Sequence, residues 1–197
     1  MNVISEGEIS IEKMLDILLF WSSKKVDAFR CDMAEMVPVE FWNYAINKVK
    51  EKYPDVIFVA EIYNPKEYKN YIEKGKFDYL YDKVALYDTI KNIMQGHGWT
   101  DHIVGIQDYK ADIEHNMLHF LENHDEQRIA SPDFAGSAEK GKPAMVVSAT
   151  ISTSPTMVYF GQELGEPGAE NAGFGSPTII CATSAMYIEE LLLLHCF

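Results

Sequence analysis

The chain alternates between short apolar runs and amphipathic helical segments, and this alternation restricts its fold more than any other feature. Apolar residues recur at helical spacing over residues 8–22, and the apolar run "VDAFRC" follows. A second helical pattern starts after Pro38 and ends at "EKYPD", and the run "VIFVAEIY" comes next. Strand and helix in repeated alternation predict a parallel α/β architecture.

The rest of the chain continues the pattern. We expect strands at "FDYLY", "MLHFLENHD" and "PTMVYFGQE", and helices at "KVALYDTIKNIMQ" and "GKPAMVVSATIS". The run "VIFVAEIY" is apolar at nearly every position, as a parallel strand covered on both faces should be.

The spacing of three acids favours a barrel over an open sheet. Asp32 and Glu61 are 29 positions apart, and Glu61 and Asp125 are 64 apart, close to one and two strand-helix units of a (β/α)₈ barrel at about 30 residues each. Each acid then lies at the carboxyl end of a strand, where barrel enzymes build their sites. A doubly wound sheet would bind ligands at the same ends, but neither a G-x-G-x-x-G nor a P-loop motif occurs.

Charge and composition narrow the choice of partner. The net charge of -13 and the pI of about 4.8 argue against nucleic acid and anionic membranes, which bind clustered Lys and Arg. The longest aliphatic run is far shorter than the about 20 residues of a membrane span, and "MNVISEGEIS" has no secretory pattern, so localisation stays open. We expect Cys31, Cys181 and Cys196 to be free thiols.

Arg30 and Asp32 stand two positions apart at the end of the first predicted strand. Side chains alternate along a strand, so both face the same way. A guanidinium beside a carboxylate lowers its pKa and keeps it ionised, as a carboxylate nucleophile requires. Taken alone, the pair is also consistent with a structural ion pair at a strand end.

Two further segments place polar groups at strand ends. Glu61 precedes Ile62 and Tyr63, and apolar or aromatic neighbours favour the protonated form of a carboxyl, which a general acid needs. The segment "ENHDEQR" supplies Asn123 to Asp125. Each could be an ordinary polar residue or turn, and a metal site is less favoured because no second His stands at ligand spacing.

Together these groups suggest glycoside hydrolysis. Retaining glycosidases hold two carboxyl groups about 5–5.5 Å apart, and neighbouring parallel strands, about 4.8 Å apart, would deliver that separation.

The segments "VDAFRCDMA", "FVAEIY" and "FLENHDEQR", in this order and spacing, closely resemble signature segments of the α-amylase family, glycoside hydrolase family 13. "PTMVYFGQELGEPG" resembles the eighth strand of that family and the loop after it. Ala28 departs from the family's common Gly. The resemblance implies a partial TIM (β/α)₈ barrel, approximately strands 4 to 8, with residues 1–178 as a partial catalytic domain.

The resemblance also implies roles. Asp32 would be the nucleophile with Arg30 as its partner, Glu61 would be the acid and then the base, and Asp125 would stabilise the transition state. The expected substrate is an α-1,4-glucan: starch, glycogen or a maltooligosaccharide.

Three further residues are expected to bind substrate. His124 would assist the sugar contacts, Asn123 would support them, and Tyr63 would stack on a sugar or pack in the core. The alternatives are a non-catalytic glucan-binding fragment and a family transglycosylase, because related reactions use the same acids.

The family's first three strands would lie upstream of Met1, as would the region on which its usual Ca²⁺ site draws. No cofactor is therefore expected in this chain, although Ca²⁺ is possible in a full-length parent. We expect the isolated chain to fold poorly, because open strand edges invite aggregation. Residues 179–197 do not resemble the family, so we expect an altered reading frame or a genuine terminal helix there.

Overall fold

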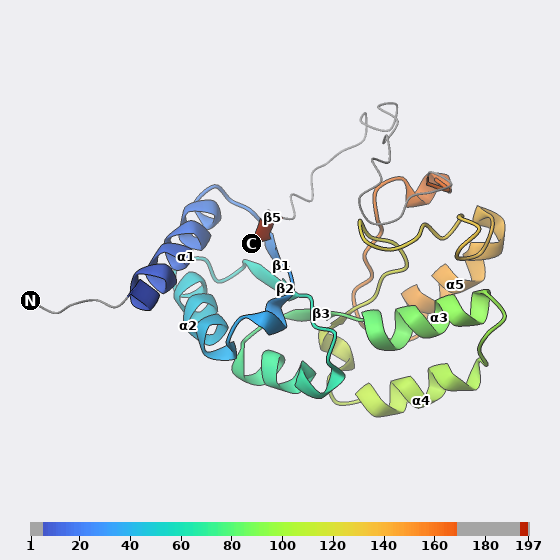
Figure 1. Ribbon diagram of the computed structural model, residues 1–197, viewed down its shortest axis with the longest axis horizontal. Coiled ribbons are helices and arrows are strands. Elements are labelled where there is room, and N and C mark those ends of the chain that lie inside the picture. The colour runs from blue at the N-terminus through green and yellow to red at the C-terminus, as the bar shows by residue number, and fades with distance from the viewer. Residues whose placement is uncertain (1–5, 169–193, 197) are drawn as a thin grey trace, which may run out of the picture. The chain divides into compact units, whose positions relative to one another are not determined.

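The computed structural model describes residues 6–168 and 194–196 of the chain (Figure 1). It divides into two units, residues 1–80 with 190–197 and residues 81–189, and each is described by itself. Most of the expected atypical tail, 179–197, therefore lies outside the described residues. Residues 194–196 form a strand rather than the terminal helix considered above.

The first unit is a parallel sheet with helices. Its elements are α1 (Glu6–Ser22), β1 (Ala28–Cys31), η1 (Ala34–Met36), α2 (Val39–Lys50), β2 (Ile57–Ala60), η2 (Pro65–Glu67), η3 (Asn70–Lys74), β3 (Tyr79–Tyr81) and β5 (Leu194–Cys196). The strand order is β3-β2-β1-β5, and every pairing is parallel. The predicted parallel α/β architecture and the first three predicted strands are confirmed.

Apolar packing fixes the register of β1 against β2. Ala28 pairs with Ile57, and the register continues to Cys31 and Ala60. Phe29 and Phe58 are paired in this register, and their buried rings stack with centroids 5.2 Å apart. Since side chains alternate along a strand, this aromatic pair directs the next residue of each strand to the opposite face.

Helix α2 begins directly after Pro38, as predicted. It buries one face, formed by Val39, Trp42, Ala45, Ile46 and Val49. The Trp42 ring packs on Phe77, with centroids 5.0 Å apart. Proline suits a helix start because it needs no hydrogen-bond partner for a backbone N–H.

The second unit is mostly helical. Its elements are η4 (Lys83–Tyr87), α3 (Asp88–Met94), α4 (Asp101–Lys110), η5 (Glu114–Asn116), β4 (Met117–Leu118), α5 (Ala138–Thr150) and η6 (Gln162–Leu164). The predicted helix near residue 83 is a π-helical turn that leads into α3. Helix α4 was not predicted, and the expected last strand is reduced to one parallel bridge between His119 and Thr156.

None of the helices in the described part of the chain combines the length and the apolar character needed to cross a membrane.

The stacked phenylalanines give a test of the first unit. Phe58 is 0% exposed, whereas Ile57, next to it on β2, is 38% exposed. We expect Phe58→Ala to lower the free energy of unfolding by about 3–5 kcal/mol, because it leaves a cavity, and Ile57→Ala to lower it by under about 1 kcal/mol. Urea unfolding followed by tryptophan fluorescence measures both, and equal losses would contradict this packing.

Candidate active site

A buried arginine lies at the centre of the candidate site in the first unit. The Arg30 side chain is 1% exposed and forms an ion pair with Asp32. Its second terminal nitrogen, Nη2, lies 3.0 Å from Glu61 Oε2. The register explains this arrangement, because Asp32 and Glu61 each follow the last paired residue of neighbouring strands. Arg30 and Asp32 therefore face the same way, as predicted, and one guanidinium serves both acids.

Glu61 has polar neighbours, which corrects the apolar surroundings expected for it. Its side chain is 3% exposed. The Tyr63 hydroxyl donates a hydrogen bond to Glu61 Oε1 at 2.7 Å, and the Met33 amide donates one to Oε2 at 3.0 Å. These donors and Arg30 replace the water that the buried carboxylate has lost, and they fix its orientation.

The turn after β1 supplies that amide. Met33 has a left-handed backbone, with φ 40° and ψ 43°, a conformation that is costly for a residue with a side chain. The Ala34 amide donates to the Glu61 carbonyl, and the Glu61 amide donates to the Cys31 carbonyl, both at 3.0 Å. Trp42 Nε1 donates to the Ala34 carbonyl at 3.0 Å. The turn is thus attached both to the residue after β2 and to α2.

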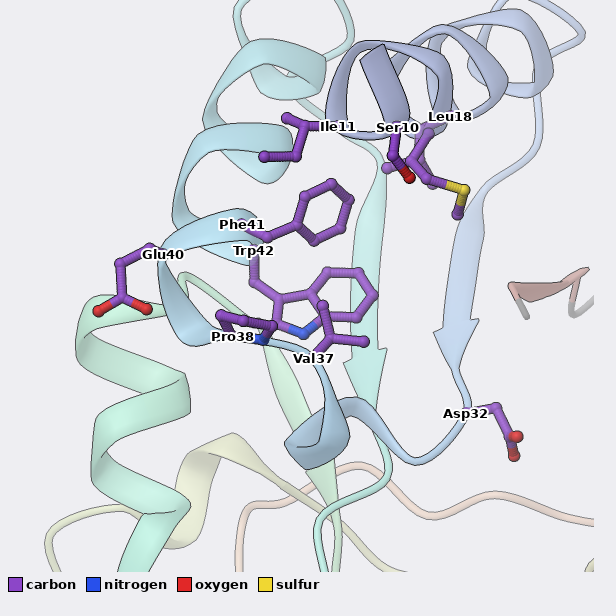
Figure 2. A pocket seen from close by; sticks show the side chains of 10 residues that line it. Ser10, Ile11, Leu18, Asp32, Val37, Pro38, Glu40, Phe41 and Trp42 are labelled. Carbon is purple, nitrogen blue, oxygen red and sulfur yellow. The ribbon is translucent and has the colours of Figure 1, made fainter. Parts of the chain in front are cut away.

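Asp32 is the more accessible of the two acids. Its side chain is 41% exposed, so an external molecule can reach the carboxylate. It also lies at the edge of a groove with a volume of about 460 Å³. Figure 2 shows Asp32 at a distance from the aromatic side chains of the groove. The groove is lined by Ser10, Ile11, Met14, Leu18, Asp32, Val37, Pro38, Glu40, Phe41 and Trp42. Because most of these side chains are apolar, the groove matches hydroxyl-rich ligands poorly.

The predicted polar segment of the second unit forms a closed turn. Asn123 Oδ1 accepts hydrogen bonds from the amides of Asp125 and Glu126, both at 2.8 Å. His124 Nε2 lies 3.1 Å from Asp125 Oδ2, and these two side chains are 37% and 24% exposed. The structure thus gathers the predicted residues into two groups: Arg30, Asp32, Glu61 and Tyr63 in the first unit, and Asn123, His124 and Asp125 in the second.

Glu122 and Arg128, at the two ends of this segment, form an ion pair that was not predicted from the sequence. Glu122 Oε2 pairs with Arg128 Nη1 at 2.7 Å, and Oε1 accepts from the Ile129 amide at 2.8 Å. Arg128 also donates to the Phe160 carbonyl at 2.6 Å. Burial raises the pKa of Glu122, and the bonds from Arg128 and Ile129 offset only part of that effect. Glu122 and Arg128 are six positions apart in "ENHDEQR", and this spacing of an acid and a base could have indicated the ion pair.

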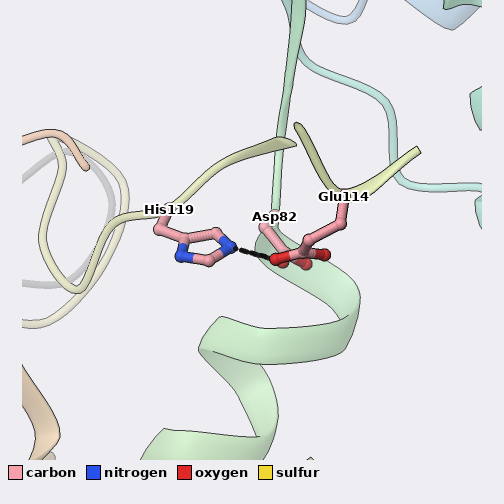
Figure 3. A group of neighbouring side chains, drawn as sticks. All are labelled: Asp82, Glu114 and His119. Atoms are coloured by element: carbon pink, nitrogen blue, oxygen red, sulfur yellow. Dashed lines mark hydrogen bonds and ion pairs between the residues drawn. The ribbon is translucent and has the colours of Figure 1, made fainter. Parts of the chain in front are cut away.

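One group among the described residues has the composition of a metal site. Asp82, Glu114 and His119 place their ligand atoms within 4.8 Å of one another (Figure 3). However, the fully buried ammonium of Lys110 pairs with Asp82 and lies 3.2 Å from Glu114 Oε2. A cation from the chain itself therefore pairs with both carboxylates, and we interpret the group as a structural ion-pair cluster.

Hydrogen bonds complete this cluster. His119 Nε2 lies 2.8 Å from Glu114 Oε1, and Nδ1 lies 2.8 Å from the Ser148 carbonyl. Burial opposes ionisation of Glu114, but the His119 hydrogen bond and the Lys110 charge outweigh it and lower its pKa to about 2. His119 thereby connects the end of β4 to α5.

Comparison with known proteins identifies the family. The family model described as "Alpha amylase, catalytic domain" matches residues 5–187. The chain belongs to the alpha-amylase family. The alpha-amylase MalA of Haloarcula japonica is 30% identical over 159 residues, which cover 79% of this chain and 22% of MalA. An alpha-1,4-glucan:maltose-1-phosphate maltosyltransferase of Cereibacter sphaeroides is 44% identical over 48 residues, 24% of this chain and 8% of the transferase.

Solved structures agree with the family assignment. An alpha-amylase from Lactobacillus plantarum superposes with a TM-score of 0.64 at 26% identity, covering 81% of this chain and 40% of that one. The parallel sheet, its helices and this likeness confirm the predicted partial (β/α)₈ barrel of the alpha-amylase family. The chain spans less than a third of the length of MalA and less than half of the Lactobacillus plantarum chain.

The low pKa of Glu114 predicts how the stability of the protein changes as pH falls. A carboxyl whose folded-state pKa is depressed stabilises the protein above its ordinary pKa of 4.5 and loses that contribution as pH falls toward about 2. We expect Glu114→Gln to remove up to about 3 kcal/mol of stability at pH 7 and to flatten the loss of stability between pH 4.5 and 2.

Urea unfolding followed by far-UV circular dichroism measures this dependence. Glu139→Gln is the matched control, because Glu139 is exposed and pairs only locally, with Lys142. An acid dependence that is the same in Glu114→Gln and in the unaltered chain would contradict the assigned role of Glu114.

Proposed function

We propose that this chain carries the nucleophile and the acid/base of a retaining α-glycosidase of the alpha-amylase type that hydrolyses α-1,4-glucan. One observation carries the proposal: Asp32 and Glu61 follow neighbouring parallel strands and contact the same buried guanidinium. Two carboxyl groups at the ends of neighbouring strands are the arrangement that double displacement at a sugar carbon requires.

The first half of the reaction uses both acids. Asp32 attacks the anomeric carbon and forms a covalent glycosyl ester, while the bond from that carbon to the leaving oxygen breaks. Glu61 gives its proton to the leaving oxygen. Arg30 keeps Asp32 ionised, and its ion pair with the exposed carboxylate holds the nucleophile at the strand end.

The second half reverses these roles. Glu61, now ionised, takes a proton from a water molecule, and the resulting hydroxide attacks the anomeric carbon and releases Asp32. The Tyr63 hydroxyl and the Met33 amide hold the Glu61 carboxyl group in one orientation for both proton transfers.

We also assign sugar contacts to the polar turn of the second unit. We assign transition-state stabilisation to Asp125, with His124 assisting through the contact between the two side chains. Asn123 Oδ1 is already bonded to two backbone amides, so we assign Asn123 to support of the turn. Tyr63 is 36% exposed and is the aromatic candidate for stacking on a sugar.

The substrate class rests on the relatives. MalA is named an alpha-amylase, which supports starch, glycogen or maltooligosaccharides as substrates and α-glucan as the partner. The maltosyltransferase match over 48 residues supports a second candidate, transfer of a glucosyl or maltosyl unit. Both reactions share the covalent intermediate and differ in whether water or a sugar hydroxyl takes the glycosyl group.

Turnover of a chromogenic maltooligoside by the purified chain tests the proposal. Because open strand edges are expected to make the isolated chain fold poorly, turnover is measured on the folded fraction. We expect that fraction to release the chromophore and Glu61→Gln to lower kcat about 10²- to 10⁴-fold, because the amide cannot donate a proton to the leaving oxygen. Asp32→Asn should abolish burst formation of the glycosyl ester. Glu73→Gln, which removes an exposed carboxylate from the same unit, is the control and should retain full activity.

The products separate the alternatives. Longer oligosaccharides formed with maltose as acceptor would favour the transferase. Glucan binding that persists in Glu61→Gln without turnover in any variant would favour a glucan-binding fragment and contradict a hydrolase. Activity that survives in both acid variants would remove Asp32 and Glu61 from the mechanism.

A further inference from the structure

We propose that Glu35 is a positioning residue: it fixes the loop after β2 so that the Tyr63 hydroxyl reaches Glu61. This inference rests on the proposed function, because Glu61 is the acid/base there. Glu35 lies in η1, in the turn that follows Asp32, and none of the sequence patterns singled it out.

The Glu35 carboxylate binds two consecutive backbone amides of the loop after β2. The Tyr63 amide donates to Oε1 and the Asn64 amide donates to Oε2, both at 3.1 Å. Hydrogen bonds to an ionised acceptor are about twice as strong as neutral ones. Both carboxylate oxygens are thus used to hold the backbone of a single dipeptide.

Glu35 is itself held in place. The Tyr71 hydroxyl donates a shared hydrogen bond to two backbone carbonyls. These are the Glu35 carbonyl oxygen at 3.2 Å and the Val37 carbonyl oxygen at 3.0 Å. Tyr71 is 5% exposed and is packed near Phe77. The carboxylate therefore extends from a backbone that is anchored to the core of the first unit.

Tyr63 needs this support. Its side chain is 36% exposed, so core packing covers it only in part, while its hydroxyl lies 2.7 Å from Glu61 Oε1. The backbone position of Tyr63 decides whether the hydroxyl can reach that oxygen. Glu35 sets this position through the Tyr63 amide, so it acts on Glu61 indirectly.

A positioning role and a merely structural role differ in kinetics. If Glu35 acts through Tyr63, its loss slows the proton transfers at Glu61 more than it weakens substrate binding, to which Tyr63 contributes by stacking. Removing both residues should then cost no more than removing one. Loss of structure alone would instead lower stability and add to the effect of a Tyr63 variant.

The experiment compares Glu35→Ala, Glu35→Gln, Tyr63→Phe and the double variant Glu35→Ala/Tyr63→Phe with the unaltered chain. We expect Glu35→Ala to lower kcat about 10- to 100-fold and to change KM less than kcat. Tyr63→Phe should have a similar effect, and the double variant should be no slower than the slower single variant. Glu35→Gln keeps one carbonyl acceptor and should recover part of kcat. Glu73→Ala is the control.

Amide exchange measured by NMR tests the same inference without turnover. We expect the amides of Tyr63 and Asn64 to exchange at least about fivefold faster in Glu35→Ala, because each loses its acceptor. The Met33 amide, which donates to Glu61 Oε2, should also exchange faster if Glu61 loses its fixed orientation. Glu73→Ala should leave all three unchanged.

The outcomes separate this inference from the proposed function. An unaltered chain that turns over substrate, with kcat unchanged in Glu35→Ala, would overturn the inference and leave the function standing. An unaltered chain that is folded but shows no turnover would contradict the function, and exchange at Tyr63, Asn64 and Met33 would then decide for or against Glu35. Additive kinetic losses in the double variant would overturn the positioning role.

Discussion

The burial of one guanidinium determines how the first unit builds its candidate site. Arg30 is 1% exposed, and removing an ion from water costs several kcal/mol unless charged partners compensate. Its partners, Asp32 and Glu61, follow two different strands. A shift of one residue between β1 and β2 would turn one of these acids to the opposite face and leave the guanidinium with one partner. The ion pairs and the stacked phenylalanines therefore favour the same register.

The backbone at Met33 links this charge cluster to the rest of the unit. A left-handed residue with a side chain is costly and persists only where its surroundings impose it. Here this conformation directs the Met33 amide to the Glu61 side chain and the Ala34 amide to the Glu61 carbonyl. An alternative turn with ordinary angles would release both bonds. The strain thus lies at the position that joins the two strand ends carrying the acids.

Local patterns predicted the parts of this structure that depend on neighbours in sequence. The two-residue period of a strand was enough to place Arg30 beside Asp32, and the 29-residue spacing placed Glu61 on the next strand. Helix α4 escaped prediction because its apolar residues form no continuous buried face, and Val104 is 64% exposed. The last expected strand pairs only at Thr156, and the chain then turns at Gly161, which has φ 77°.

Contacts between distant segments could not be predicted in this way. The apolar surroundings expected for Glu61 came from Ile62 and Tyr63, its neighbours in sequence. The structure instead brings in the Met33 amide, 28 positions away, and turns the Tyr63 hydroxyl inward. Glu35 escaped notice for the same reason, because its partners lie 28 and 29 positions further along. Such contacts depend on the register of β1 and β2, which only the folded sheet specifies.

Two charge clusters in this chain illustrate how a reactive site differs from a structural one. In the second unit, Lys110 and His119 face Asp82 and Glu114, and each side chain is at most 11% exposed. Such a cluster has almost no surface for a ligand.

The cluster around Arg30 has the opposite properties. Two carboxylates share one guanidinium, and the Asp32 side chain is 41% exposed. A carboxylate that a ligand can reach suits a reaction whose transition state resembles a sugar oxocarbenium ion. The accessibility of Asp32, rather than the number of acids, therefore distinguishes the cluster around Arg30 as the candidate reactive site.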